Sequence, residues 1–379
     1  MRVAVIYQVW PHYRLPVALE MDADPAIAYS FYGSGERLEG IEHLDISRLG
    51  RFVIARSTSI GRLLWQGGAV RAALTGRYDA IVLLANPNHL STWIAAPLAR
   101  LRGIPVLFWG HGWLRQDTGP KRLFRHGFYR LADHLLLYAE RGKRLGMAAG
   151  WKDEDITVVY NSLSVDQADA IIARIERGEL DDHIPQRRFA DPDRPLIVCT
   201  ARLTDKCRFH LLLDAAARLA ERGRPINILL LGDGPERQAL EDQARRLSIA
   251  AIFHGACYDE TITGPLLYHA DLTVSPGKIG LTALHSLMYG TPAITHGTLD
   301  DQMPEVEAIE PGRTGAFFTN GDAGSLADTI ADWLAQAPDR ATVRAACRAT
   351  TRDRWNPKAQ ARILSEALHR VVNARRSVT

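Results

Sequence analysis

The sequence has little cysteine and no long apolar run. Its four cysteines lie in the second half of the chain and form no CxxC pair, which argues against a zinc site and a disulfide framework and fits a reducing cytoplasm. No apolar stretch reaches the ~20 residues that a transmembrane helix needs. The first residues, MRVAVIYQVW, predict a strand rather than a signal peptide. We therefore expect a cytoplasmic protein.

Several motifs of catalysis and cofactor binding are also missing. The chain has no Gly-x-Ser-x-Gly, HExxH or Walker lysine loop, and no pair of acids supports a metal site. Gly232-x-Gly234 suggests a dinucleotide fingerprint, but Arg237 stands where the third glycine belongs. The next predicted strand carries no acid that could bind a ribose hydroxyl. These observations argue against a dehydrogenase.

Charge of one sign is not in large excess, but it is unevenly distributed. The 46 Lys and Arg against 43 Asp and Glu are too close to balance to imply nucleic acid. Five arginines and no acid lie between Arg51 and Tyr78, and a second basic stretch runs from Lys121 to Arg144. Apolar residues are interleaved with both stretches: Leu63, Leu64, Trp65, Phe124, Phe128 and Tyr129. Such surfaces suit an anionic membrane, and the alternative is amphipathic helices with their apolar sides in the core.

Strands and helices alternate through both halves of the sequence, as a parallel α/β sheet requires. In the first half, the apolar pattern predicts strands at Arg2–Tyr7, Ala26–Tyr32, Ala80–Leu84, Pro105–Trp109, Leu135–Tyr138 and Ile156–Tyr160. It predicts helices at Ser59–Leu74, Thr92–Leu101, Arg122–Ala132, Ala139–Ala149 and Val165–Arg177. In the second half, strands are expected at Leu196–Thr200, Ile226–Leu231, Ile252–His254 and Asp271–Val274. The helices there are expected at Leu211–Glu221, Glu236–Leu247, Pro265–His269, Ser325–Ala335, Pro338–Arg348 and Ala359–Ala374.

A chain of 379 residues exceeds one ordinary core and predicts two domains. Residues 178–195 are charged and contain three prolines, which is typical of an interdomain linker. We therefore expect one domain over residues 1–177, a second over residues 196–354, and a terminal helix over residues 355–379. Two similar halves predict a ligand cleft between them.

The segment Val274–His296 predicts a phosphate-binding turn. A strand end runs into Ser-Pro-Gly, and Gly280 then opens a short helix, so free N–H groups would face an anion such as a diphosphate. Arg202 and Lys206 follow the first strand of the second half and would lie at the same sheet edge. The alternatives are an ordinary strand-to-helix turn and a pair of exposed charges.

His111 is the candidate that the first half contributes. It lies between two glycines directly after the strand Pro105–Trp109. Ligands bind at the carboxyl ends of strands in open α/β sheets, so His111 is either a ligand contact or part of a structural turn.

Taken in order, these segments resemble the retaining glycosyltransferases of the GT-B fold, family 4. TARLTDKCRFHLLLDA is similar to the family's phosphate-binding segment, SPGKIGLTALHSLMYGTPAIT to its donor loop, and MPEVEAIEPGRTGAFF to the segment that follows. ADHLLLYAERGKRLG and ITVVYNSLSVD resemble the end of the acceptor domain. The resemblance implies two Rossmann-like parallel-sheet domains facing a cleft, with the C-terminal helix crossing back to the first domain.

The resemblance also implies roles for particular residues. Arg202 and Lys206 would bind the donor's diphosphate and stabilise the leaving group, the N–H groups of Ile279–Thr282 would hold the diphosphate or the sugar, and His111 would face the transferred sugar. No metal or cofactor is implied, and the nucleotide-sugar is a substrate. The implied donor-binding residues are Gly277, Lys278, Ile279, Gly280, Leu281, Thr282 and His285.

The sequence departs from the family pattern at two places. Alignment on Gly290-Thr291-Pro292 puts Gly277 and His285 where the family has two glutamates. Neutral His285 can still donate a hydrogen bond to a hydroxyl or accept one from it. Cys207 falls at the family's lysine position, so either Lys206 or Arg208 holds the phosphate, and Lys206 is favoured.

The function implied is transfer of a sugar, with retention of configuration, from a nucleotide-sugar to a glycan that is lipid-linked. The expected setting is cell-surface polysaccharide synthesis at the inner face of the cell membrane, with peripheral contact to anionic lipid and no nucleic acid. The two missing glutamates leave a non-catalytic glycan- or nucleotide-sugar-binding protein as an alternative. An acceptor-independent sugar-nucleotide enzyme, such as an epimerase, is the other.

Overall fold

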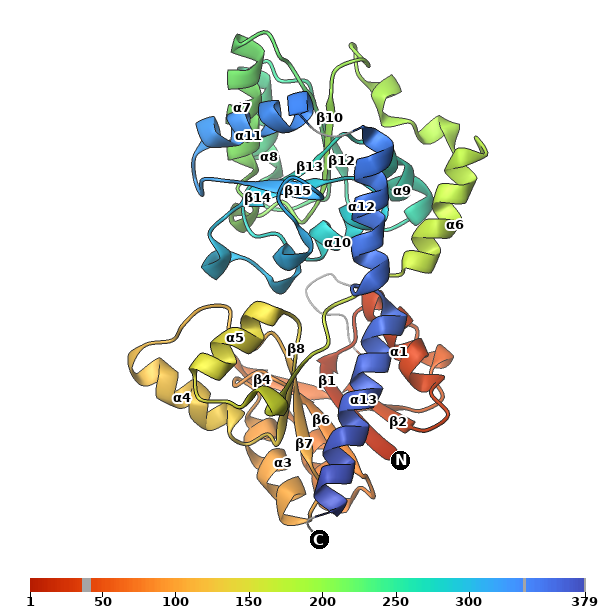
Figure 1. Ribbon diagram of the computed structural model, residues 1–379, viewed down its shortest axis with the longest axis vertical. Helices are drawn as coiled ribbons and strands as arrows, with labels where there is room; N and C mark the ends of the chain where they lie inside the picture. Colours follow the sequence, from red (N-terminus) through yellow and green to blue (C-terminus); the bar gives the residue numbers. More distant parts are fainter. Residues whose placement is uncertain (36–41, 337–338, 378–379) are drawn as a thin grey trace. The chain divides into compact units, whose positions relative to one another are not determined.

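The computed structural model describes residues 1–35, 42–336 and 339–377, and it divides the chain into two compact units (Figure 1). The first unit comprises Met1–Leu163 and Asn356–Thr379, and the second comprises Ser164–Trp355. Each unit contains parallel strands and helices in alternation. The α/β class predicted from the sequence is therefore confirmed.

The first unit is built on one parallel sheet of seven strands. The order is β3-β2-β1-β6-β7-β8-β9, so the direction of the strand order reverses between β1 and β6. Such a reversal leaves a crevice at the carboxyl ends of the two strands, where ligands bind in open α/β sheets. The strands are β1 (Arg2–Val9), β2 (Ala28–Ser34), β3 (Phe52–Ile54), β6 (Ala80–Leu84), β7 (Val106–Gly110), β8 (His134–Leu137) and β9 (Ile156–Val158).

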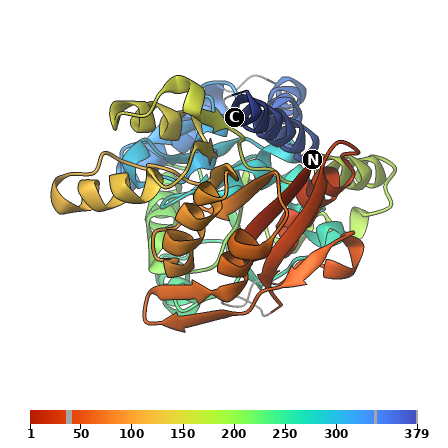
Figure 2. The ribbon, with the colours of Figure 1, turned by 90° about the horizontal axis from the view of Figure 1, so that it is seen from below.

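Alternating side chains of this sheet enter two apolar cores, because successive strand residues point to opposite faces. Val3 and Val5 pack on one face with helices α1 (Leu15–Asp22) and α13 (Pro357–Arg376). Ala4 and Ile6 pack on the other face. That second face is covered by α2 (Gly67–Thr75), α3 (Leu90–Leu101) and α4 (Gly119–Tyr129), and α5 (Glu140–Ala148) follows β8. Figure 2 shows the red and orange strands between the orange helices and the blue C-terminal helix.

The C-terminal helix α13 belongs to the first unit. Its Leu364 and Leu368 are buried in the same core as Val3, and Ser365 Oγ donates a hydrogen bond to Asp24 Oδ2 at 2.7 Å. The Asn356 side chain caps its first turn by accepting a hydrogen bond from the backbone N–H of Ala359 at 2.9 Å. The return of the terminal helix to the first domain, which the resemblance implied, is what the structure shows.

The second unit has six parallel strands in two groups of three. The groups β10-β11-β12 and β13-β14-β15 are joined by a parallel bridge between Ile197 and Leu272, where Val198 N–H donates to Leu272 O at 2.9 Å. The strand order therefore reverses between β10 and β13, which creates a second switch point. The strands are β10 (Leu196–Thr200), β11 (Asn227–Leu231), β12 (Ala251–Gly255), β13 (Thr273–Ser275), β14 (Ala293–His296) and β15 (Gly315–Phe318).

Helices cover the second unit in two groups that are separate in Figure 1. One group is α7 (Phe209–Glu221), α8 (Arg237–Arg246) and α11 (Ala323–Gln336). The other is α6 (Val165–Glu176), α9 (Glu260–His269), α10 (Leu281–Met288) and α12 (Arg340–Asp353). Asp169 of α6 pairs with Arg348 and Arg352 of α12 at 2.8 and 2.7 Å.

The observed boundary between the units differs from the expected one. The sequence placed α6 in a first domain ending at residue 177, whereas the structure groups α6 with the second unit because of its contacts with α12 and α9. The expected linker, residues 178–195, is also part of this unit, since Leu180 and Pro185 are buried and Gln186 Nε2 donates to His269 O at 2.8 Å. Burial of a few apolar side chains therefore outweighs the charged, proline-containing composition.

The helix predicted over Ser59–Leu74 is wrong in its first half. Strands β4 (Ser57–Ile60) and β5 (Leu63–Gln66) form an antiparallel hairpin there, and only α2 is helical. Gly61 has φ +59°, a conformation that suits the first position of a two-residue hairpin turn. The β-branched and aromatic residues around the turn favour strands.

Candidate functional site

Two loops meet at the switch point of the second unit, one after β10 and one after β13. The N–H of Gly277 donates to Cys207 O at 3.0 Å, and the N–H of Lys278 donates to Lys206 O at 3.2 Å. A Cβ atom on Gly277 would lie 2.0 Å from Lys206 O, so only glycine permits this approach of two backbones. The structure therefore brings the predicted Lys206 and Gly277 segments together.

The Gly232–Gly234 turn after β11 supports the β10 loop from its other side. Cβ atoms at Gly232 and Gly234 would lie 1.8 Å from Ala201 O and 2.2 Å from Leu203 O, and Leu203 N–H donates to Asp233 O at 3.0 Å. Close packing of one loop on another thus accounts for both glycines.

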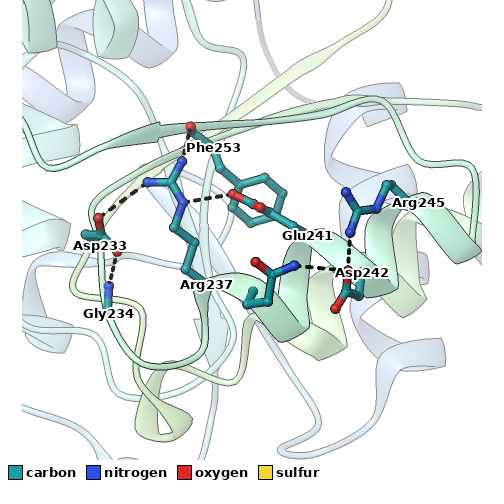
Figure 3. Close-up of polar contacts among 8 residues, drawn as sticks. Asp233, Gly234, Arg237, Glu241, Asp242, Arg245 and Phe253 are labelled. Atoms are coloured by element: carbon teal, nitrogen blue, oxygen red, sulfur yellow. Dashed lines mark hydrogen bonds and ion pairs between the residues drawn. The ribbon is translucent and has the colours of Figure 1, made fainter.

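Arg237 fixes the same turn, as Figure 3 shows. Its guanidinium contacts Glu241 Oε1 at 2.8 Å, Asp233 Oδ2 at 3.4 Å and the carbonyl of Phe253 at 3.0 Å. Asp233 Oδ1 also accepts the N–H of Gly234 at 2.7 Å. An arginine held this way occupies the place of the third fingerprint glycine, in keeping with the argument against a dehydrogenase.

Unpaired cations surround the meeting point of the two loops. Arg202, Lys206 and Lys278 are exposed, and none of them forms an ion pair within the described part of the chain. Arg208, in contrast, has the left-handed φ of +52° and donates from Nη1 to Asn320 Oδ1 at 2.7 Å. Lys206 therefore keeps an open ammonium group for a ligand, whereas the Arg208 guanidinium is engaged by the protein.

The N–H groups available to a ligand are fewer than the sequence predicted. Ile279 N–H donates to the buried Gln302 Oε1 at 2.8 Å, so it is occupied and the prediction for Ile279 must be corrected. Gly280 is the N-cap of α10, and the N–H groups of Leu281 and Thr282 belong to its first turn. N–H groups of a first helical turn have no acceptor within their own helix and attract anions.

His285 is a half-buried residue of α10 that two neighbours hold. Its Nδ1 is 3.3 Å from Thr200 Oγ1, and its Nε2 is 3.1 Å from a carboxylate oxygen of Glu260. Tyr289 OH donates to the same carboxylate at 2.6 Å. Burial acts to raise the pKa of Glu260, but the adjacent His285 and the hydrogen bonds from His285, Tyr289 and Thr263 lower it to about 2.

Glu260 is a residue that the sequence analysis missed. The helix α9 that carries it was expected only from Pro265, since proline disfavours a helix interior. Asp259 gave the signal for an earlier start, because its side chain accepts the N–H of Thr261 at 2.8 Å as an N-cap. The structure thus places a carboxylate beside His285, one of the two positions where the family glutamates are absent.

The switch point of the first unit contains a buried arginine near His111. Arg14 follows β1 in the 3-10 helix η1 (His12–Arg14), and its guanidinium lies over the rings of Tyr7, Trp109 and Tyr138 at 5.0, 5.2 and 5.3 Å. It donates from Nη2 to Tyr138 OH, while its buried Nη1 has no hydrogen-bond partner among the described residues. Arg14 was not predicted as a site residue, although a cation in the loop that follows β1 was the available signal.

His111 follows β7 at the same edge of this sheet. Its ring centroid lies 5.0 Å from that of Tyr138, and one side of the residue is exposed to solvent. Partial desolvation by the surrounding protein and then the charge of Arg14 lower the pKa of His111 to about 4. The imidazole is therefore neutral near pH 7 and can donate or accept one hydrogen bond at each nitrogen.

The apolar residues of the two basic stretches differ in their exposure, and Leu64 is half-buried. Leu63, Trp65 and Phe124 are 45%, 40% and 55% exposed. Phe128 and Tyr129, at 0% and 2%, belong to the core and must be removed from the expected membrane surface. The first set lies on the β4–β5 hairpin and on α4, so the structure leaves part of the predicted basic and apolar surface accessible.

Neither a metal cluster nor a membrane-spanning helix occurs in the described part of the chain. Among residues 1–35, 42–336 and 339–377, no three His, Cys, Asp or Glu side chains gather so that they could hold a metal ion. In the same ranges, no helix combines the length and apolar character needed to cross a bilayer.

Residues 181–350 match the family described as Glycosyl transferases group 1. The glycogen synthase of Leptothrix cholodnii is 32% identical over 166 residues, which are 38% of this chain and 33% of that protein. A GDP-mannose-dependent alpha-(1-6)-phosphatidylinositol dimannoside mannosyltransferase of Mycobacterium tuberculosis is 34% identical over 116 residues, 30% of each chain. The chain thus spans about a third of the length of these curated relatives.

Several solved structures share the fold of nearly the whole chain. Anabaena HepE in complex with UDP has a TM-score of 0.71 at 17% identity, covering 97% of this chain and 100% of that one. A glycosyltransferase from Rickettsia africae has a TM-score of 0.76 at 14% identity, covering 98% of both chains. With two Rossmann-like units and these neighbours, the chain has the GT-B fold.

Proposed function

We propose that this protein is a glycosyltransferase of family 4 that transfers a sugar from a nucleotide-sugar to a glycan acceptor with retention of configuration. The proposal rests on Arg202 and Lys206 at the switch point of the second unit, near the first turn of α10. Neither of these cations has an ion-pair partner among the residues that the structure describes. This switch point lies within the segment that matches the glycosyltransferase family.

The donor's diphosphate is the group that this arrangement suits. The Arg202 guanidinium can form a bidentate pair with a phosphate, and Lys206 adds a point charge. The N–H groups of Gly280, Leu281 and Thr282 add partial positive charge from the start of α10. As the bond to the sugar breaks, negative charge grows on the leaving phosphate, and these groups stabilise that charge.

His285 and Glu260 are proposed to contact the nucleoside or sugar of the donor. The Glu260 carboxylate orients the ring through Nε2, and Thr200 contacts Nδ1. A histidine fixed at both nitrogens by protein groups presents its ring in one position rather than in several. Because both nitrogens of His285 already contact protein groups, the hydroxyl contact that the family makes with a glutamate is assigned on this proposal to the Glu260 carboxylate.

The acceptor side is proposed to lie on the first unit. His111 would contact the transferred sugar as a neutral hydrogen-bonding group, consistent with its lowered pKa. Exposed Leu63, Trp65 and Phe124, together with nearby cations, suit peripheral contact with an anionic membrane surface and thus a lipid-linked acceptor. The setting proposed is the inner face of the cell membrane, in the synthesis of a cell-surface polysaccharide.

The proposed reaction needs no metal ion, because cations of the protein and the start of a helix already face the diphosphate. Activity should therefore persist in excess EDTA. Loss of activity in EDTA that added magnesium restores would contradict this part of the proposal.

Donor turnover tests the function. A thermal-shift screen against UDP-, GDP- and ADP-sugars would select the donor, since a ligand that binds the native state raises its melting temperature. Mass spectrometry would then follow transfer by wild type, by Arg202→Ala and by Arg246→Ala, whose exposed arginine on α8 is the control. Arg202→Ala should lower turnover by on the order of 10²-fold, with the control unchanged.

Three results would overturn the proposal in distinct ways. Donor binding without any turnover would indicate a non-catalytic binding protein, which the absent family glutamates at Gly277 and His285 suggest as an alternative. Product formed without an acceptor would indicate a sugar-nucleotide enzyme such as an epimerase. Unchanged turnover in Arg202→Ala would remove that residue from the site.

A further inference from the structure

A cavity of about 790 Å³ lies in the first unit, separate from the proposed donor site. Five arginines line it, together with Tyr32 and Tyr78, and no aspartate or glutamate lines it. The arginines are Arg2, Arg51, Arg56, Arg71 and Arg77. Arg2 lies at the start of β1. The other four belong to the acid-free stretch between Arg51 and Tyr78.

The fold brings these residues together on one face of the sheet. Arg2 has the same parity along β1 as Ala4 and Ile6, whose side chains pack on the face covered by α2. In the register of β2 and β3, Tyr32 pairs with Val53, and both line the cavity. Arg71 enters from α2.

The frame of the cavity is closely packed. A Cβ atom on Gly68, in the first turn of α2, would lie 2.5 Å from the Cβ of Ala55 after β3. Tyr32 OH and Tyr78 OH are 2.7 Å apart and form a hydrogen bond across the cavity lining. Arg2 lies on β1 and Arg71 on α2, whereas the other three arginines lie in short segments beside β3 and between α2 and β6.

None of the five arginines forms an ion pair with another of the residues that the structure describes, and all five are exposed. The nearest acid in sequence, Asp79, does not line the cavity, and its carboxylate accepts the backbone N–H of Arg2 at 2.7 Å and a hydrogen bond from Arg376 at 2.9 Å. Like charges that converge without a counter-charge repel one another. An anion of the right size would relieve this repulsion and bind tightly.

Phosphate is the anion that such a set of groups recognises best. The guanidinium fork matches two phosphate oxygens, and several forks can share one phosphorylated group. The volume of about 790 Å³ exceeds the need of a single phosphate and falls within the range of sites for organic ligands. A ligand with two or more phosphate charges would pair with most of the five arginines.

We propose that this cavity binds a phosphorylated ligand with at least two negative charges, supplied either by a free polyphosphorylated molecule or by the headgroup of an anionic lipid. The inference does not depend on the proposed transfer reaction, since it concerns a second anion site on another unit. It assigns the acid-free arginine stretch to a defined binding site, whereas general attraction to a membrane surface would assign it to none.

The test measures two probes on the full chain. Inositol hexakisphosphate in solution is titrated by calorimetry, and vesicles of phosphatidylcholine with one fifth phosphatidylinositol 4-phosphate are tested by co-sedimentation. The site variant is Arg51→Ala/Arg71→Ala. The control is Arg246→Ala/Arg354→Ala, which removes two exposed arginines of the second unit that lie outside the proposed donor site and outside both basic stretches. Arg202→Ala/Lys206→Ala is measured separately, because the proposed donor site can also bind the soluble probe.

The proposal predicts that the site variant weakens binding of at least one probe by tenfold or more, while the control changes it by less than threefold. Loss confined to the soluble probe assigns a free ligand, and loss confined to vesicles assigns a lipid headgroup. Failure of wild type to bind either probe would overturn the proposal. So would equal weakening in the site variant and the Arg246→Ala/Arg354→Ala control. The conservative pair Arg51→Lys/Arg71→Lys, which keeps the charges, gives a second readout if the alanine variant fails to fold.

Discussion

Replacing Gly277 with alanine should separate the two loops on which the proposed donor site depends. The new Cβ would lie 2.0 Å from Lys206 O, far inside the 3.4 Å at which ordinary contact begins. The carbonyl oxygen belongs to the loop backbone, so it cannot rotate away from the new Cβ as the end of a flexible side chain could. The loops must therefore move apart by more than 1 Å, as the difference between these two distances requires.

The cost can be worked out from the contacts that this movement breaks. The N–H groups of Gly277 and Lys278 lose their bonds to Cys207 O and Lys206 O, now 3.0 and 3.2 Å long. Each backbone bond contributes about 1 kcal/mol, and overpacking adds about 1–3 kcal/mol. We expect the free energy of unfolding of the second unit to fall by about 3–5 kcal/mol in total.

Gly297→Ala is the matched control, since a Cβ atom added at Gly297 would meet no other atom within 3.4 Å and its φ is not in the left-handed region. Urea unfolding followed by circular dichroism would compare both variants with wild type, and calorimetry would measure nucleotide affinity under native conditions. Gly277→Ala should also bind its nucleotide at least tenfold more weakly, although glycine offers the ligand no side chain. Equal stability and equal affinity of the two variants would refute the reasoning.

Three further predictions concern single features of the structure. Glu260→Gln should weaken donor binding roughly tenfold, because the His285 ring loses its carboxylate partner. Calorimetry should show a loss of about 1–2 kcal/mol in the free energy of donor binding. Unchanged affinity would remove the His285–Glu260 pair from the site. Burial lowers the pKa values of His89 and His134 to about 4, so between pH 6.5 and 4 the unfolded chain binds more protons than the folded chain. The free energy of unfolding should therefore fall as pH falls through this range, by up to about 1.4 kcal/mol per pH unit for each histidine. Urea titrations across this range should show a shallower fall for His134→Gln. Gly127→Ala, in an exposed helical position with no atom within 4 Å, should raise stability by about 0.5–1 kcal/mol, and any loss would contradict the packing described for α4.

Much of the fold follows from local patterns in the sequence. Apolar runs and helical periodicity located most strands and helices, because each pattern is set by which side of one element is buried. Strands β14 and β15, of four residues each, were not predicted, since strands this short depend on neighbours rather than on their own sequence. The sequence pattern predicts a helix where the β4–β5 hairpin lies, although Gly61 between polar and apolar runs marks a turn.

The candidate site was partly predictable for the same reason. Arg202, Lys206 and Gly277 lie in the loops that follow β10 and β13, and parallel strands place such loops at one edge of the sheet. Arg14 and Glu260 were missed because their importance comes from partners far away in the chain: Tyr138 for Arg14, and His285 for Glu260. The sequence shows the acid-free arginine stretch, but it does not show that these arginines line a cavity, because the cavity depends on the packing of α2 against β3.

The affinity of the wild-type protein and of Arg202→Ala/Lys206→Ala for a nucleoside diphosphate tests the central claim most directly. Calorimetry with UDP, GDP and ADP should find one nucleotide that binds wild type, and the double variant should bind that nucleotide at least a hundredfold more weakly while melting at the same temperature. If no nucleoside diphosphate binds wild type, or if the double variant binds one as tightly as wild type does, the switch point of the second unit is not a donor site.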